Sequence, residues 1–193
     1  MTKRPLFAVF AVVACTSSLL SGCAPLVVGA AVAGTALVVA DRRSVGAQAD
    51  DEAIELKIAN NIGAGFGDRV HVNVTSYNGL VLLTGEVPTQ DLVGQIGEIA
   101  RTTAKVRRVV NEIGVMPVSS IGTRTNDSYI TSKVKARFVE ANKFPPNRVK
   151  VVTEREVVYL MGLVTHAEGD AAAQIAATTS GVIRVVKLFE YLD

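Results

Sequence analysis

Cysteine is nearly absent from this sequence. Only Cys15 and Cys23 occur among its 193 residues. Cys15 lies in an apolar N-terminal segment that processing would remove, and Cys23 is itself a candidate for modification. No intramolecular disulfide is then possible, even in an oxidising compartment, so the fold must be held by packing.

Catalytic and metal-binding motifs are also missing. The sequence has no G-x-S-x-G, H-E-x-x-H or P-loop pattern, and 63–67 is glycine-rich but lacks a preceding strand and nucleotide-binding spacing. Neither of its two histidines, His71 and His166, has a Cys, His or carboxylate at ligand spacing. We therefore expect an exposed or capping role for the histidines, no metal, no catalytic residues and no enzyme activity.

A strong net charge is lacking once the N-terminus is set aside. The whole chain has 20 basic and 18 acidic residues, and removing Lys3 and Arg4 leaves 18 of each. The mature chain would be formally neutral. This neutrality argues against nucleic acid as a partner.

The N-terminus has the organisation of a secretory signal. Lys3 and Arg4 precede an apolar stretch from Leu6 to Leu20, and Leu20-Ser21-Gly22-Cys23 has the form of a bacterial lipobox. We predict that residues 1–22 are removed and that Cys23 carries N-acyl and S-diacylglycerol groups, with no other cofactor. The alternative is an uncleaved N-terminal anchor, although 15 apolar residues are few for a bilayer span.

An apolar segment follows the lipidated residue. Residues 24–40 are rich in Ala, Val and Gly, and 44–49 are small and polar, so 23–49 is predicted to be a tether and linker. The tether could lie on the membrane surface. Its small-xxx-small spacings also leave self-association open.

The rest of the chain contains an internal repeat. Residues 51–115 and 127–193 superimpose at a shift of 76–77 positions. Each copy begins with an apolar stripe at i, i+4 and i+8, which predicts a helix with one buried face. The stripes are Ile54, Ile58 and Ile62, and Ile130, Val134 and Phe138.

A hairpin, a second helix and a third strand complete each copy. Asn78-Gly79 is a strong signal for a two-residue turn, and 165–168 has the form of a capping box. Gly85 and Gly162 occupy matching positions inside strands, where glycine marks a bulge or a close backbone approach. The fold class is therefore α+β: two tandem αββαβ domains, each a three-stranded mixed sheet with two helices on one face. The predicted domains are 50–116 and 127–193, joined by a linker at 117–126.

Each copy resembles a BON domain. The resemblance rests on 80–87 and 157–164, and on 104–111 and 181–186, with Ala104 standing where the family prefers glycine. The lipobox, the tether and two such copies are similar to the dual BON-domain outer-membrane lipoproteins, and Ala24 after Cys23 resembles outer-membrane sorting. The resemblance implies a protein of the outer membrane that faces the periplasm, binds anionic phospholipid, chiefly phosphatidylglycerol, through its second domain and supports envelope integrity.

The distribution of charge agrees with this expectation. Residues 124–150 contain seven basic and two acidic side chains, and the first copy has no equivalent. Lysine and arginine near an anionic lipid surface contribute about 1 kcal/mol each, and aromatic side chains can enter the headgroup layer. We predict phospholipid contacts by Tyr129, Lys133, Arg137, Phe144 and Arg148. A solvated helix face remains the alternative, as does a non-catalytic scaffold that contacts outer-membrane assembly proteins. The oligomeric state stays open.

Overall fold

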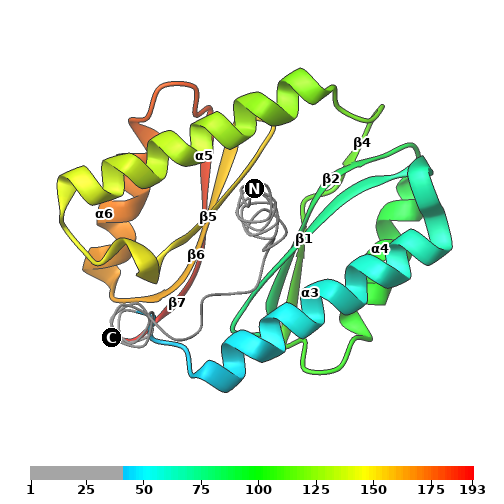
Figure 1. Ribbon diagram of the computed structural model, residues 1–193, viewed down its shortest axis with the longest axis horizontal. Coiled ribbons are helices and arrows are strands. Elements are labelled where there is room, and N and C mark those ends of the chain that lie inside the picture. The colour runs from blue at the N-terminus through cyan, green and yellow to red at the C-terminus, as the bar shows by residue number, and fades with distance from the viewer. Residues whose placement is uncertain (1–40) are drawn as a thin grey trace, which may run out of the picture. The chain divides into compact units, whose positions relative to one another are not determined.

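The computed structural model describes residues 41–193, so the predictions for Cys23 and for 24–40 lie outside the described residues. The predicted α+β class and the two αββαβ copies are confirmed (Figure 1). The first repeat contains α3 Val45–Phe66, η1 Gly67–Arg69, β1 His71–Tyr77, β2 Leu80–Val87, α4 Gln90–Arg101, β3 Arg108–Asn111 and β4 Gly114–Val115. The second contains α5 Ile121–Ala141, η2 Pro146–Arg148, β5 Lys150–Glu154, β6 Val157–Val164, α6 His166–Ala177 and β7 Arg184–Tyr191. Within 41–193, no helix is both long and apolar enough for a membrane span.

Both sheets are mixed. In the first, β2 pairs antiparallel with β1 and parallel with β3, and the two-residue strand β4 continues alongside β2. In the second, β6 lies between an antiparallel β5 and a parallel β7. The single third strand predicted for the first repeat is thus divided into β3 and β4.

Both hairpins turn through two residues with positive φ. Asn78 and Gly79 have φ of 52° and 74°, whereas Arg155 and Glu156 in the second repeat have φ of 50° and 61° without a glycine. The primed turn that positive φ produces matches the right-handed twist of paired strands. The Asn-Gly signal was therefore present in the sequence of only one of the two hairpins.

Two segments predicted as linkers are partly helical, because serine side chains cap the helices earlier than expected. Ser44 is the N-cap of α3 and accepts a hydrogen bond from Ala47 N at 3.1 Å, so 45–49 belongs to α3 and not to a linker. Ser120 accepts one from Thr123 N at 3.2 Å, so α5 begins inside the predicted linker 117–126. The glycine-rich stretch 63–67 is mostly helical, because α3 continues to Phe66 and ends at Gly67, where φ is +55°.

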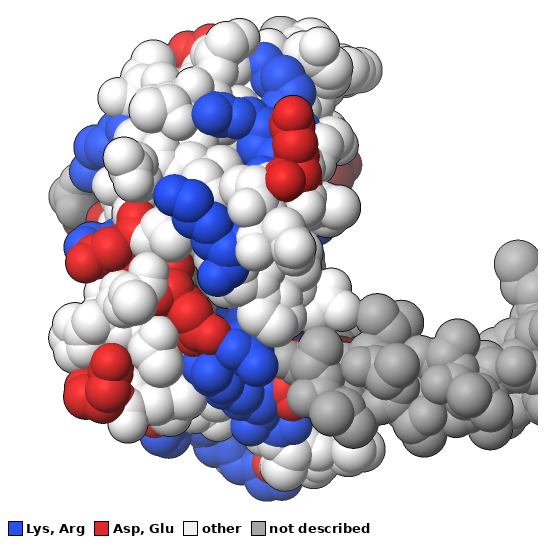
Figure 2. All heavy atoms as spheres, turned by 90° about the vertical axis from the view of Figure 1, so that its left-hand side faces the viewer, with Lys and Arg blue, Asp and Glu red and all other residues white. Residues whose placement is uncertain are grey.

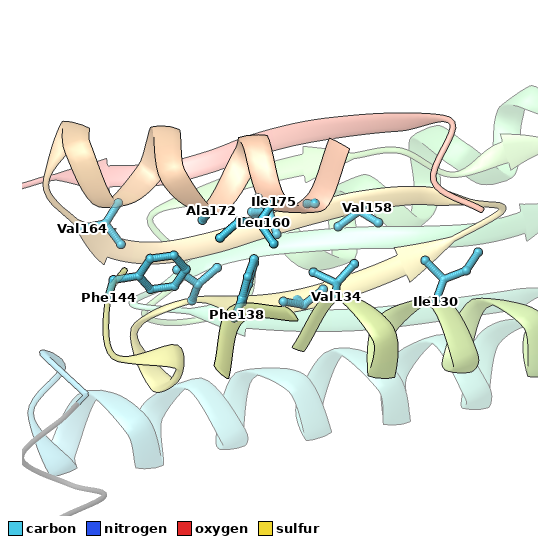
Figure 3. Close-up of a cluster of buried hydrophobic side chains, with 12 residues drawn as sticks. Ile130, Val134, Phe138, Phe144, Val158, Leu160, Val164, Ala172 and Ile175 are labelled. Carbon is cyan, nitrogen blue, oxygen red and sulfur yellow. The ribbon is translucent and has the colours of Figure 1, made fainter. Parts of the chain in front are cut away.

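One core lies between each sheet and its two helices. The helical stripes predicted from the sequence are buried in these cores, and Figure 3 shows the stripe of α5 facing β6 and α6. The first core contains Ile54, Ile58, Ile62, Val81, Leu83, Val87, Ile96, Ala100 and Ile113. The second contains Ile130, Val134, Phe138, Phe144, Val149, Val151, Val158, Leu160, Val164, Ala172, Ile175 and Ala176.

A third core joins the two sheets on the faces that the helices leave open. Leu82 of β2 and the alternate residues of β6 contribute to it, so β2 and β6 are buried on both faces. This explains why both strands are apolar at nearly every position instead of alternating. The buried members of this core are Tyr77, Leu82, Tyr159, Met161, Leu163 and Leu188.

Two strand glycines lie against the backbone of a neighbouring segment. A Cβ at Gly85 would be 2.1 Å from His71 O, and one at Gly162 would be 2.4 Å from Arg148 O. Gly85 also has φ of +114°, which side chains rarely adopt. The β1–β2 ladder runs through Gly85 without interruption, so this glycine marks a close backbone approach and not a bulge.

Candidate functional site

Helix α5 has one face in the core and one face in solvent. Ile130, Val134 and Phe138 are buried, whereas Tyr129 and Val139 are 62% and 65% exposed. At 100° per residue, this places the exposed aromatic and aliphatic side chains opposite the core stripe. The outward face of α5, which carries Tyr129 and Val139, therefore exposes apolar side chains that are not part of the core.

Cations border this outward face. The Lys133 ammonium lies 4.6 Å from the centre of the Tyr129 ring, a cation–π distance. Lys135 and Lys143 are exposed. Of the two acidic residues in α5, Asp127 is buried and only Glu140 is exposed. The fully exposed charges of α5 are therefore Lys135 and Glu140, while Lys133 and Arg137 are partly buried.

Two of the predicted lipid-binding cations hold α5 onto the C-terminal end of α6. Arg137 donates to Ile175 O at 3.0 Å and to Thr179 Oγ1 at 2.8 Å, and Lys133 donates to Ser180 O. Carbonyls at a helix C-terminus lack intrahelical partners, and cations there are favourable against the helix dipole. These contacts give Arg137 a structural role.

Arg148 lies at the other end of α6. Its guanidinium pairs with Glu168, whose carboxylate also completes the predicted capping box with Thr165. Burial raises the pKa of Glu168, but the hydrogen bonds from Thr165 N, Arg42 and Arg148 outweigh it and hold the pKa below its ordinary value. A 12-residue helix is about 18 Å long, so Arg148 and Arg137 do not form one patch.

Phe144 is a correction to the predicted site. Its side chain is 4% exposed and packs edge-on against Phe138, with ring centres 5.1 Å apart (Figure 3). An aromatic ring after a helix can complete the core beneath it as readily as it can reach a membrane, and the sequence does not distinguish these roles. Phe144 cannot reach lipid in this fold.

The charges on the surface near α6 alternate in sign. Figure 2 shows the side of the molecule that carries α6 and the C-terminal end of α5, and there Lys and Arg side chains are separated by Asp and Glu. On this side of the molecule, the basic side chains therefore do not form one continuous patch. Among the predicted residues, the structure brings Tyr129 and Lys133 together, with Lys133 also donating to Ser180 O. It assigns Arg137, Phe144 and Arg148 to internal contacts.

Sequence reasoning missed a buried aspartate in each repeat. Asp51 accepts hydrogen bonds from Asn78 N and Gly79 N at 2.7 and 2.8 Å, and Asp127 accepts two from the corresponding turn of the second repeat. Each therefore fastens the first helix to the hairpin. The signal was the repeat itself, because an aspartate stands at matching positions in both copies.

The segment before α3 contacts both repeats. Arg43 lies 4.0 Å from the Tyr77 ring centre and pairs with Asp41 and Asp51 at 2.7 and 2.8 Å. Arg42 instead pairs with Glu168 of the second repeat at 2.6 Å. Adjacent arginines thus tie the chain entering α3 to both halves of the fold.

His71 lies near carboxylates that its sequence spacing does not reveal. The structure brings His71, Glu86 and Glu154 together, with ligand atoms all within 4.8 Å of one another. The carboxylates come from distant parts of the sequence, so local ligand spacing could not show them. His166 has the predicted exposed position: its ring stacks on Tyr191 at 4.0 Å, and its Nδ1 lies 2.9 Å from Asp193 Oδ1.

Comparison with known proteins explains the repeat. The family model described as the BON domain matches residues 50–117 and 126–193. The chain belongs to the BON-domain family. Both BON domains correspond to the two αββαβ repeats, and the resemblance inferred from the strand motifs is confirmed.

The chain is also similar to three curated relatives. It is 39% identical to the outer membrane lipoprotein DolP of Haemophilus influenzae, over 90% of this chain and 91% of that protein. It is 34% identical to a 21 kDa hemolysin of Actinobacillus pleuropneumoniae, over 79% and 80% of the two chains. The osmotically-inducible protein Y of Escherichia coli is 29% identical over 72% and 71%. The dual BON-domain organisation of the DolP type extends over most of this chain.

Proposed function

We propose that this protein is an outer-membrane lipoprotein, anchored at Cys23 and facing the periplasm, that binds anionic phospholipid through the second BON domain. Binding uses the outward face of α5 and supports the integrity of the envelope. The proposal involves no catalysis. A phosphatidylglycerol-like headgroup, with one negative charge and exposed hydroxyls, is the ligand class.

The outward face of α5 is the observation that carries this proposal. Tyr129 and Val139 are exposed although the apolar stripe of the helix is already buried, and Lys133 and Lys135 flank them. Exposed aromatic and aliphatic groups beside lysines suit the boundary between headgroups and acyl chains. The corresponding helix of the first domain, α3, has Lys57 as its single basic residue and is not suited to an anionic surface.

The proposed location rests on the lipobox and on the relatives. The signal segment and Cys23 agree with the lipid attachment expected of a lipoprotein such as DolP of Haemophilus influenzae. Acyl chains would keep the protein at the membrane, so a weak headgroup contact gains from high effective concentration. The contact by α5 would then select the lipid and the orientation, and need not provide the attachment.

Vesicle binding by residues 41–193 tests the proposal without the anchor. All the described helices, strands and cores lie in this segment, so it retains the whole binding face. We expect co-sedimentation with phosphatidylglycerol vesicles and little with phosphatidylcholine vesicles. Lys135→Glu should weaken binding at least about fivefold, because each lysine near such a surface contributes about 1 kcal/mol.

Lys57→Glu is the matched control. It makes the same charge change at an exposed position of α3 and should leave vesicle binding nearly unchanged. Equal binding to both vesicle types would overturn the proposal, as would equal losses in the two variants. If the protein does not bind vesicles but does bind envelope proteins, the result would favour the scaffold alternative.

A further inference from the structure

Three potential metal ligands meet where the two BON domains face each other. His71 and Glu86 are direct partners across β1 and β2 in the first domain, and Glu154 ends β5 in the second. One ligand atom from each side chain lies within 4.8 Å of the other two. The hairpin pairs His71 with Glu86, and the domain arrangement adds Glu154, which is 83 sequence positions from His71.

The carboxylates of Glu86 and Glu154 are buried and accept few hydrogen bonds. Glu86 is 0% exposed and its Oε1 has no hydrogen-bond partner, while its Oε2 accepts only a 3.3 Å bond from Ser119 N. Glu154 is 4% exposed and accepts from Asn73 Nδ2 at 2.8 Å. Burying charged carboxylates is costly unless a cation or several donors face them.

No protein cation pairs with either carboxylate within residues 41–193. The salt bridges of this part of the chain use other acidic groups. Arg124 lines the same hollow, but its guanidinium donates to Ser119 O at 3.1 Å and to Ser119 Oγ at 3.4 Å. The positive charge that two buried carboxylates require is therefore not supplied by these side chains.

The cluster is open to solvent on one side. A hollow of about 230 Å³ is lined by His71, Asn73 and Glu154 from the sheets and by polar residues of α5. His71 is only partly buried, so a hydrated ion can approach it from this hollow. Glu86 is not among the residues that line this hollow, and its unpartnered Oε1 is buried beside the other two ligands.

We propose that His71, Glu86 and Glu154 bind one divalent transition-metal ion of the Zn²⁺ type. An imidazole nitrogen with two carboxylate oxygens is a typical set of three protein ligands for Zn²⁺, with water in the fourth position. Calcium and magnesium prefer oxygen ligands alone, so the histidine selects against them. Tetrahedral ligands about 2.0–2.2 Å from an ion lie roughly 3.3 Å apart, which small side-chain rotations can reach from the present spacing.

The neighbouring groups suit this role. The hydrogen bond from Asn73 orients the Glu154 carboxylate, as second-shell partners of metal ligands do. Because the ligands come from both domains, the bound ion would join them. This site lies apart from the outward face of α5, and the inference does not depend on lipid binding.

Titration of the metal-free full chain in detergent micelles with ZnCl₂ tests the inference. Isothermal calorimetry should show one site per chain, and excess Ca²⁺ should not compete. Glu86→Gln, which keeps the side-chain shape, and His71→Asn should each weaken binding at least about tenfold. Zn²⁺ should raise the melting temperature of the unaltered chain and not that of the variants.

His166→Asn is the matched control, because it removes the other histidine of the chain. It should bind Zn²⁺ as the unaltered chain does. The inference is overturned if the unaltered chain binds no Zn²⁺, if binding persists in both ligand variants, or if His166→Asn abolishes it. Far-UV circular dichroism in chelator separates loss of the site from loss of the fold, and His71→Asn provides the test if Glu86→Gln unfolds.

Discussion

Replacing Asp51 by asparagine should destabilise the first BON domain strongly. The carboxylate is buried and accepts from Asn78 N, Gly79 N and Ser76 Oγ at 2.6–2.8 Å, and it pairs with Arg43 at 2.8 Å. Asparagine has only one acceptor oxygen, and its NH₂ group would face N–H groups that now donate to the carboxylate. Hydrogen bonds to charged groups contribute about 1.5–3 kcal/mol each, and breaking a buried ion pair costs about 3–5 kcal/mol. We expect a loss of roughly 3–5 kcal/mol in the free energy of unfolding.

Asp127→Asn provides the internal comparison. Asp127 accepts from Arg155 N and Glu156 N, both at 2.9 Å, and forms no salt bridge within 41–193. Its replacement should cost less, about 1.5–3 kcal/mol. Urea unfolding followed by far-UV circular dichroism measures both, since the chain has no tryptophan. Equal losses in the two variants would refute the role given to Arg43.

The same contact predicts a pH dependence. Burial raises the pKa of Asp51, but the hydrogen bonds from Ser76, Gly79, Asn78 and Arg43 outweigh it, so the pKa lies below the ordinary value. The carboxylate therefore stabilises the fold fully above the unfolded pKa of about 3.9, and this contribution is lost as the pH falls through the folded pKa. The stability difference between the unaltered chain and Asp51→Asn should shrink below about pH 4. A constant difference down to acid unfolding would contradict this assignment.

Two further predictions concern the sheets. Gly85→Ala should lower the free energy of unfolding by about 3 kcal/mol or more, because the added Cβ would overlap His71 O and the φ of this residue is unfavourable for alanine. Gly94→Ala in α4 is the control, because a Cβ there meets open space; it should be neutral or stabilise by up to about 1 kcal/mol in thermal unfolding. Similar effects of the two substitutions would refute the close approach at Gly85. Burial and the carboxylate of Glu112 raise the pKa of Tyr159 to about 12, so ultraviolet titration should find its hydroxyl protonated at pH 11. Glu112→Gln should lower the pKa of Tyr159, and an unchanged pKa would contradict the contact.

The local architecture could be predicted from the sequence because it depends on short-range patterns. The i, i+4, i+8 stripes located the buried faces of α3 and α5, and Asn78-Gly79 located the first hairpin. The sequence analysis predicted helices on one face of each sheet, and it did not predict that the other faces of the two sheets cover each other. That packing depends on contacts between residues about 80 positions apart.

The candidate site was predictable only in part, because the sequence shows where a lysine or arginine stands but not which group its side chain contacts. Arg137 and Lys133 find backbone carbonyls at the end of α6, which no residue pattern reveals. Phe144 completes the core beneath Phe138. The convergence of Glu86 and Glu154 likewise arises from the domain arrangement.

The central claim is that α5 of the second BON domain contacts anionic lipid, and nuclear magnetic resonance tests it most directly. The acylated chain would be placed in nanodiscs carrying a spin-labelled headgroup, with either phosphatidylglycerol or phosphatidylcholine as the bulk lipid. Because the anchor is the same in both, any difference reports on the headgroup. The account predicts that signals of Tyr129 and Val139 broaden in phosphatidylglycerol and much less in phosphatidylcholine. Equal broadening in the two lipids, or broadening confined to α3, would contradict it.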